Sequence, residues 1–163
     1  MSENSEFILR RATELEREPI RRLIHEAQIN PMGLDWRRFV VAVDDQEQVI
    51  GCGQIKEHRG GARELASLAV SPEWRGRGAA GAIIRWLMGE AQPPLWLMCR
   101  SDLVQLYLGF GFVEIGPDEI QPPYFRRMRR LAKALLFAAR GDYLAVMAWR
   151  GEEVGGEVGR LAG

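Results

Sequence analysis

The spacing of apolar residues changes repeatedly along the chain, and each change predicts a new helix or strand. Apolar runs at 39–43, 49–56 and 62–70 have the length of strands, and only short polar turns separate them. Three such strands in succession predict an antiparallel meander. Similar runs predict strands at 7–11, 95–99, 112–115 and 143–149, and one-sided apolar spacing predicts helices at 14–28, from a loop at 75–81 to about 92, at 102–108 and at 122–140.

The predicted helices have recognisable starts and apolar faces. Thr13 and Glu16 form the pattern of a capping box, which places the start of the first helix at residue 14. The apolar spacing predicts that Leu15 lies on the buried face of this helix and Leu131 on that of the last helix. Asp102 is expected to cap the short helix that ends at Leu108.

Length and composition indicate one domain at 1–150, followed by a flexible, glycine-rich tail at 151–163. The formal net charge is zero, so no global field favours nucleic acid or a membrane as a partner. Cys52 and Cys99 lie in strand-like runs and are expected to be reduced core thiols. The first residues lack the pattern of a signal peptide, so a cytoplasmic protein is expected. The oligomeric state, including a homodimer, stays open.

The stretch from Glu64 to Gly81 carries the most specific pattern. An apolar strand ends at Ser71-Pro72, and a loop rich in small residues, 75–81, then leads directly into a helix. Small residues at a helix start allow a ligand to approach the unpaired amide groups, where the helix dipole favours an anion. Arg75 and Arg77 add positive charge. The pattern predicts a phosphate-binding loop.

Two kinds of ligand-binding loop fit the sequence of this segment. Residues 76–81 read G-x-G-x-x-G, the dinucleotide fingerprint, and Asp102 lies at about the expected distance. However, five residues including a proline separate the strand from the first glycine, and too little chain follows for a doubly wound fold. The same loop also reads R-x-x-G-x-A at Arg75, Gly78 and Ala80, with V-x-P upstream at 70–72. This second pattern resembles the acetyl-coenzyme A loop of the GNAT superfamily of N-acetyltransferases.

A second motif supports the resemblance. Residues 106–112, LYLGFGF, are similar to the L-Y-x-x-x-G-F ending of the helix after the fifth strand of that family, whereas Arg100 stands where many relatives have asparagine. The resemblance covers roughly residues 6–150. It implies an α/β, GNAT-like fold, with a mixed and largely antiparallel central sheet, flanked by helices and splayed between the fourth and fifth strands.

The resemblance also implies a co-substrate, acetyl-CoA, and the residues that bind it. Backbone groups of the bulged fourth strand would pair with the pantetheine arm, and loop amides would hold the pyrophosphate. The arginines of the loop would reach the phosphates or the adenosine. The cofactor-binding residues so implied are Leu68, Ala69, Val70, Arg75, Gly76, Arg77, Gly78, Ala79 and Ala80.

Two residues are candidates for the chemistry of acetyl transfer. An amine must lose a proton before it attacks a thioester, and a carboxylate can take that proton. Relatives often carry a glutamate at the position of Glu64, whose alternative role is that of a strand residue paired with Arg63 or Lys56. Tyr107 matches the tyrosine that protonates the leaving thiolate in the family, and its alternative role is packing on Phe110 and Phe112.

The acceptor is expected to be an amine of a small molecule, a peptide or a protein. By resemblance, its pocket would be built from Gly33, Leu34, Trp36, Tyr124 and Phe125. The arginine-rich run at 126–133 fits a solvated helix face, with nucleic acid, an acidic partner or an acidic acceptor as its other uses. His25 and His58 lack ligand-spaced neighbours, so no metal site is expected. Besides the enzyme, the sequence allows a non-catalytic acyl-CoA-binding module.

Overall fold

The computed structural model describes residues 6–135 and 141–151, which divide into two compact units at the boundary between Ala91 and Gln92. The prediction of one domain at 1–150 therefore stays a prediction. The predicted tail lies outside the described residues from position 152 onward, and the end of the last predicted helix, 136–140, lies outside them as well. Within the described residues, no helix combines the length and the apolar character needed to cross a lipid bilayer.

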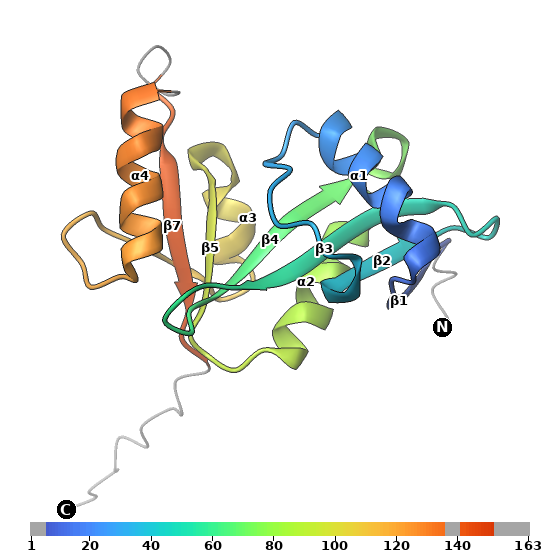
Figure 1. Cartoon of the computed structure of the whole chain (residues 1–163), viewed down its shortest axis with the longest axis horizontal. Helices are drawn as coiled ribbons and strands as arrows, with labels where there is room; N and C mark the ends of the chain where they lie inside the picture. The colour runs from blue at the N-terminus through green and yellow to red at the C-terminus, as the bar shows by residue number, and fades with distance from the viewer. Residues whose placement is uncertain (1–5, 136–140, 152–163) are drawn as a thin grey trace, which may run out of the picture. The chain divides into compact units, whose positions relative to one another are not determined.

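The first unit is built on four antiparallel strands that are neighbours in chain order (Figure 1). They are β1 (Ile8–Arg11), β2 (Phe39–Val43), β3 (Val49–Glu57) and β4 (Arg63–Val70). All five residues of β2 are buried, as expected for a continuous apolar run in the interior of a sheet. The predicted meander is confirmed.

Two helices cover opposite faces of this sheet. Helix α1 (Arg17–Glu26) packs with Cys52 of β3, whereas helix α2 (Ala79–Glu90) lies against the next residue, Gly53. Successive strand residues face opposite sides of a sheet, so the two helices do as well. A β-carbon at Gly53 would lie 2.8 Å from Cγ2 of Ile83, and glycine therefore permits the close approach of α2.

In the second unit, β7 (Leu144–Trp149) lies between β5 (Leu95–Arg100) and β6 (Val113–Ile115) and pairs antiparallel with both. The remaining elements are the 3-10 turn η4 (Ser101–Leu103), helix α3 (Val104–Leu108) and helix α4 (Pro123–Leu135). Helix α4 lies against β7, and Phe125 of α4 stacks on Trp96 of β5 with ring centroids 5.5 Å apart.

Three details of the helices differ from the sequence predictions. The first helix begins as a tight 3-10 turn, η1 (Glu14–Glu16), so Leu15 does not lie on the buried face and is 88% exposed. Leu131 is also exposed, because the buried stripe of α4 follows Phe125 and Ala132. Asp102 lies inside η4 and pairs with Arg100 instead of capping α3.

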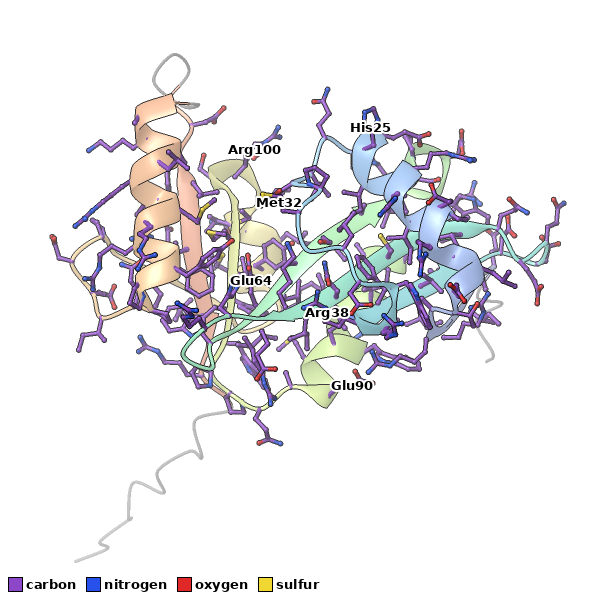
Figure 2. The ribbon with its side chains drawn as sticks, viewed as in Figure 1. His25, Met32, Arg38, Glu64, Glu90 and Arg100 are labelled. Carbon is purple, nitrogen blue, oxygen red and sulfur yellow. The ribbon has the colours of Figure 1, made fainter. Side chains whose placement is uncertain are left out.

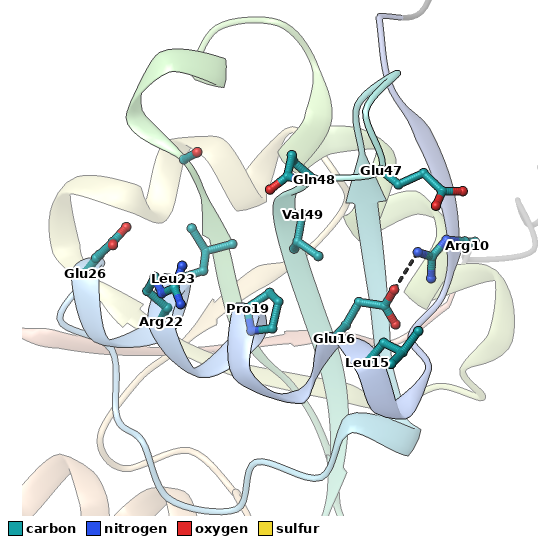
Figure 3. A pocket seen from close by; sticks show the side chains of 11 residues that line it. Arg10, Leu15, Glu16, Pro19, Arg22, Leu23, Glu26, Glu47, Gln48 and Val49 are labelled. Carbon is teal, nitrogen blue, oxygen red and sulfur yellow. Dashed lines mark hydrogen bonds and ion pairs between the residues drawn. The ribbon is translucent and has the colours of Figure 1, made fainter.

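The predicted capping box is confirmed, and its glutamate forms a partly buried ion pair. Glu16 accepts hydrogen bonds from the backbone N–H and hydroxyl of Thr13, and Arg10 Nη2 lies 2.5 Å from its carboxylate. Figure 3 shows this ion pair beside a cavity of about 310 Å³ between α1 and the β2–β3 hairpin. Burial raises the pKa of Glu16, but the hydrogen bonds from Arg10 and Thr13 outweigh burial and lower the pKa to about 2.

This lowered pKa predicts a pH-dependent contribution to stability. Folding favours the ionised carboxylate of Glu16, because its pKa is lower in the folded state than in the unfolded state. Its contribution to the free energy of unfolding is therefore present above the unfolded pKa of ~4.3 and is lost as pH falls toward about 2. Glu16→Gln should lower the free energy of unfolding by about 2–3 kcal/mol at pH 7. Denaturant unfolding between pH 7 and 2 measures the difference, and Glu14→Gln is the exposed control. A difference that persists undiminished at pH 2 would contradict the prediction.

Candidate active site

The predicted phosphate loop forms an exposed turn at the start of α2. The chain leaves β4 with a hydrogen bond from Ser71 N–H to the Ile50 carbonyl, 2.8 Å, and passes through the 3-10 turn η3 (Pro72–Trp74). Gly76 and Gly78 then adopt positive φ angles of 77° and 88°, which glycine accommodates without strain. Gly78 is the N-cap of α2 and no side chain caps the helix, so this turn can present backbone N–H groups to an anion.

Arg77 has partners of its own within this unit. Its Nη1 lies 2.6 Å from a carboxylate oxygen of Glu6, and its guanidinium stacks 4.7 Å from the ring centroid of Trp74. Both members of the ion pair are well exposed, so the pair is a weak constraint. Arg77 can therefore exchange the carboxylate for a phosphate at little cost in free energy.

Strand β4 contains the bulge that the resemblance implied. Cys52 pairs with Ala69 and Gln54 pairs with Ala66, so two residues of β4, Ser67 and Leu68, oppose Gly53 alone. Ser67 has a φ of 56°, and its hydroxyl accepts a hydrogen bond of 2.9 Å from Gln54 Nε2. The regular ladder is interrupted beside Leu68, Ala69 and Val70, the three residues predicted to pair with pantetheine.

Glu64 is a buried carboxylate in β4 (Figure 2). Its partner is His58, whose Nε2 lies 2.6 Å from Oε2 of Glu64. Burial raises the pKa of Glu64 above its ordinary value, and the interactions with His58 and Lys56 only partly offset this effect. A buried carboxylate with a raised pKa is a suitable proton acceptor near neutral pH.

The pair of Glu64 and His58 was not predicted from the sequence. Arg63 and Lys56 were the predicted partners of Glu64, and His58 was weighed only as a metal ligand. The pairing of Lys56 with Glu64 in the hairpin makes His58 the diagonal neighbour of Glu64 on the same face. The hairpin register would therefore have revealed the pair.

Tyr107 lies in the interior of the second unit. Its side chain is 6% exposed and meets Phe112 edge to face, with ring centroids 6.0 Å apart and planes at 73°. Burial is the main cause that raises the pKa of its phenol, so the hydroxyl stays protonated at neutral pH. The residue thus has the packing contact of the structural alternative and the protonated hydroxyl that the predicted catalytic role would require.

Other predicted site residues are divided between the two units. In the first unit, Gly33 is exposed, Leu34 and Trp36 are half-buried, and the guanidinium of Arg37 lies 4.9 Å from the Trp36 ring centroid. In the second unit, Tyr124 is half-buried and meets the fully buried Phe125 edge to face at 5.2 Å. Their role in an acceptor pocket stays a prediction.

The two cysteines and the arginine-rich run are placed as follows. Cys52 and Cys99 are buried and free, and burial raises the pKa of each thiol to about 12. In the run at 126–133, Arg129 donates to the Ile115 carbonyl. Its remaining cations are exposed, as expected for a solvated face: Arg126, Arg127, Arg130 and Lys133.

Residues 35–114 match the family model described as acetyltransferase (GNAT) domain. This segment of the chain matches the GNAT family. The matched segment contains the loop, the β4 bulge, Glu64 and Tyr107. This match favours the GNAT interpretation of the loop over the dinucleotide fingerprint. No curated protein sequence matches the chain significantly.

Solved structures of GNAT proteins share the fold at low sequence identity. A Mycobacterium tuberculosis protein in complex with CoA and a second ligand is 21% identical, with a TM-score of 0.64, over 86% of this chain and 98% of that one. A GCN5-related N-acetyltransferase from Kribbella flavida is 19% identical, with a TM-score of 0.62, over 91% of this chain and 100% of that one. The predicted α/β, GNAT-like fold is confirmed.

A third neighbour is much longer than this chain. N-acetylglutamate synthase from Neisseria gonorrhoeae, complexed with coenzyme A and N-acetyl-glutamate, is 19% identical with a TM-score of 0.65. The match covers 92% of this chain but only 37% of the synthase. The likeness therefore concerns the GNAT fold alone.

Proposed function

We propose that the protein is an acetyl-CoA-dependent N-acetyltransferase. The observation that carries the proposal is the uncapped, glycine-lined turn at the start of α2, which follows a bulged β4 within the segment that matches the GNAT family. The solved neighbours that hold CoA support acetyl-CoA as co-substrate. The amides of 75–80 would bind the pyrophosphate, and the backbone of 68–70 would pair with the pantetheine arm.

The proposed reaction is a direct transfer. Glu64 accepts a proton from the ammonium group of the acceptor, with His58 holding the carboxylate in place. The free amine then attacks the thioester carbonyl carbon, the new C–N bond forms, and the C–S bond breaks. As the amide forms, the attacking nitrogen loses its second proton to solvent. Tyr107 donates its phenolic proton to the departing thiolate and regains a proton from solvent, and Glu64 releases its proton to solvent. An amide and CoA are the products.

The test combines binding with turnover. Calorimetry with acetyl-CoA and with NAD(H) distinguishes the acetyltransferase from a dinucleotide-binding protein, since only one ligand should bind. A panel of amines, amino acids and peptides is then assayed for CoA release. Release that depends on an amine supports the proposal. Binding of acetyl-CoA without turnover of any acceptor would instead indicate a non-catalytic acyl-CoA-binding module, and tight NAD binding without CoA binding would overturn both interpretations.

The glycine turn itself predicts a selective loss of affinity. Gly78→Val places a branched side chain at a φ of 88°, and it also covers the amides that would face the pyrophosphate. We expect the Kd and KM for acetyl-CoA to rise at least tenfold, which corresponds to about 1.4 kcal/mol. Gly60→Val is the matched control, because Gly60 has a φ of 95° in the β3–β4 turn and equally open surroundings. Equal cofactor affinity in the two variants would place the phosphates elsewhere.

A further inference from the structure

Three side-chain donors hold the carbonyls of the loop between α1 and β2: Lys56 and Gln54 from β3, and Arg38 from the end of the loop itself. Lys56 Nζ donates to the Met32 carbonyl at 2.8 Å. Gln54 Nε2 and Arg38 Nη2 both donate to the Gly33 carbonyl, each at 3.2 Å. Figure 2 shows Met32 in this loop, with Arg38 and Glu64 in the same unit. Two positively charged groups therefore lie at the carbonyls of residues 32–33.

Within residues 6–135 and 141–151, neither Lys56 nor Arg38 forms a salt bridge with a carboxylate. Each does have a carboxylate nearby, Glu64 for Lys56 and Asp35 for Arg38. Burial lowers the pKa of Lys56, and repulsion from Arg38 lowers it further, although Glu64 opposes both effects. Two half-buried cations that repel one another favour an anion between them.

Both cations also have hydrogen-bond donors that the loop carbonyls do not use. A lysine ammonium has three donors and a guanidinium has five, and the loop carbonyls take only one from each. Nε of Arg38 is buried and has no partner in the described part of the chain. A neutral donor such as the Gln54 amide is sufficient to hold a carbonyl, so fastening the loop does not account for the charges.

The cations lie next to the proposed base. Lys56 pairs directly with Glu64 across the β3–β4 ladder, and directly opposed residues share a face with β-carbons about 5 Å apart. A molecule whose amine reaches Glu64 therefore has its neighbouring atoms close to the ammonium of Lys56. That charge repels a cationic neighbour and attracts an anionic one.

We propose that the acyl acceptor is an amino acid, in which a carboxylate close to the reacting amine binds Lys56 and Arg38. This inference rests on the proposed acetyltransferase activity and names the substrate class of the same site. The two cations would hold the carboxylate by charge-assisted hydrogen bonds, which are about twice as strong as neutral ones. The same charges would ease loss of the ammonium proton to Glu64, since a nearby cation disfavours a second positive charge.

The test compares each amino acid with its own carboxamide as acceptor, in an assay of CoA release. The carboxamide replaces the negative charge by a neutral group of similar size, and its more acidic ammonium group works against the expected preference. For the preferred side chain, we expect kcat/KM for the amino acid to exceed that for the amide by at least tenfold. Lys56→Gln keeps a neutral donor for the Met32 carbonyl and removes the charge. It should reduce this ratio about tenfold, mainly through KM for the amino acid.

Two further variants make the comparison specific. Lys56→Arg keeps the charge and should retain most of the preference, whereas Arg21→Gln removes an exposed charge on α1 and should leave the ratio unchanged. Affinity for acetyl-CoA shows that each variant is folded. Amides used as well as amino acids, or an unchanged ratio in Lys56→Gln, would overturn the inference while the transferase activity stands. Absence of turnover with every amine would overturn the proposed function itself.

Discussion

Glu64→Gln is expected to lower kcat by about 10²- to 10⁴-fold, the contribution of a positioned general base. Glutamine has nearly the same size and can still bond to His58, so packing and acetyl-CoA affinity should change little. Steady-state kinetics with a saturating acceptor measure the loss. Glu57→Gln is the control, because it removes an exposed carboxylate from the neighbouring strand β3.

The pH profile separates a base from a structural carboxylate. The pKa of Glu64 is raised mainly by burial, so the acidic limb of wild-type kcat/KM should lie above the ordinary glutamate pKa of ~4.3. This limb should disappear in Glu64→Gln. His58→Gln removes an interaction that lowers the pKa of Glu64, so the limb should move to higher pH. A full rate and an unaltered profile in Glu64→Gln would leave the carboxylate without a role in proton transfer.

The pH dependence of stability that arises from Glu64 should have the opposite sign to the one that arises from Glu16. A carboxyl whose pKa is raised by folding binds its proton more tightly in the folded state than in the unfolded state. Its favourable contribution is therefore present below the unfolded pKa of ~4.3 and is lost as pH rises through the folded pKa. Keeping a carboxyl group buried where burial raises its pKa is consistent with a functional role, because folding alone would favour an uncharged side chain here.

Much of the fold could be predicted from local patterns. The strands of the meander were found because each is an apolar run between polar turns, and β2 at 39–43 has the predicted bounds. The capping box at Thr13 and Glu16 was found because it involves residues three apart. Leu15 was misplaced because a 3-10 turn and an α-helix give similar apolar spacing over three residues, yet they direct the side chain differently.

The candidate site was harder to predict, because its contacts join distant residues. The loop motif identified Gly76 and Gly78, since the conformation they need is encoded locally. In contrast, the bonds from Gln54 and Lys56 to the loop carbonyls span 21 and 24 residues and have no local signal. The bulge at Ser67 was expected only through the family resemblance, because serine does not favour a φ of 56° by itself.

The hydroxyl of Tyr107 is the proposed proton donor to the leaving thiolate. Tyr107→Phe removes one hydroxyl and keeps the ring, including its edge contact with Phe112. If the hydroxyl protonates the leaving thiolate, kcat should fall about 10²- to 10⁴-fold while acetyl-CoA affinity and the melting temperature stay near wild type. Burial raises the pKa of this phenol, so the donor is present at neutral pH. Tyr143→Phe removes the hydroxyl of a 48% exposed tyrosine and is the matched control.

A second substitution distinguishes catalysis from packing at the same position. Tyr107→Ala removes a ring that is 6% exposed and should destabilise the fold by about 3–5 kcal/mol through the cavity that it leaves. A purely structural tyrosine would show this loss of stability together with full activity in Tyr107→Phe. That combination would assign protonation of the thiolate to water or another donor. A Tyr107→Phe enzyme that is stable but slow would instead show that catalysis requires the hydroxyl, because the rings of tyrosine and phenylalanine fill the same space in the interior.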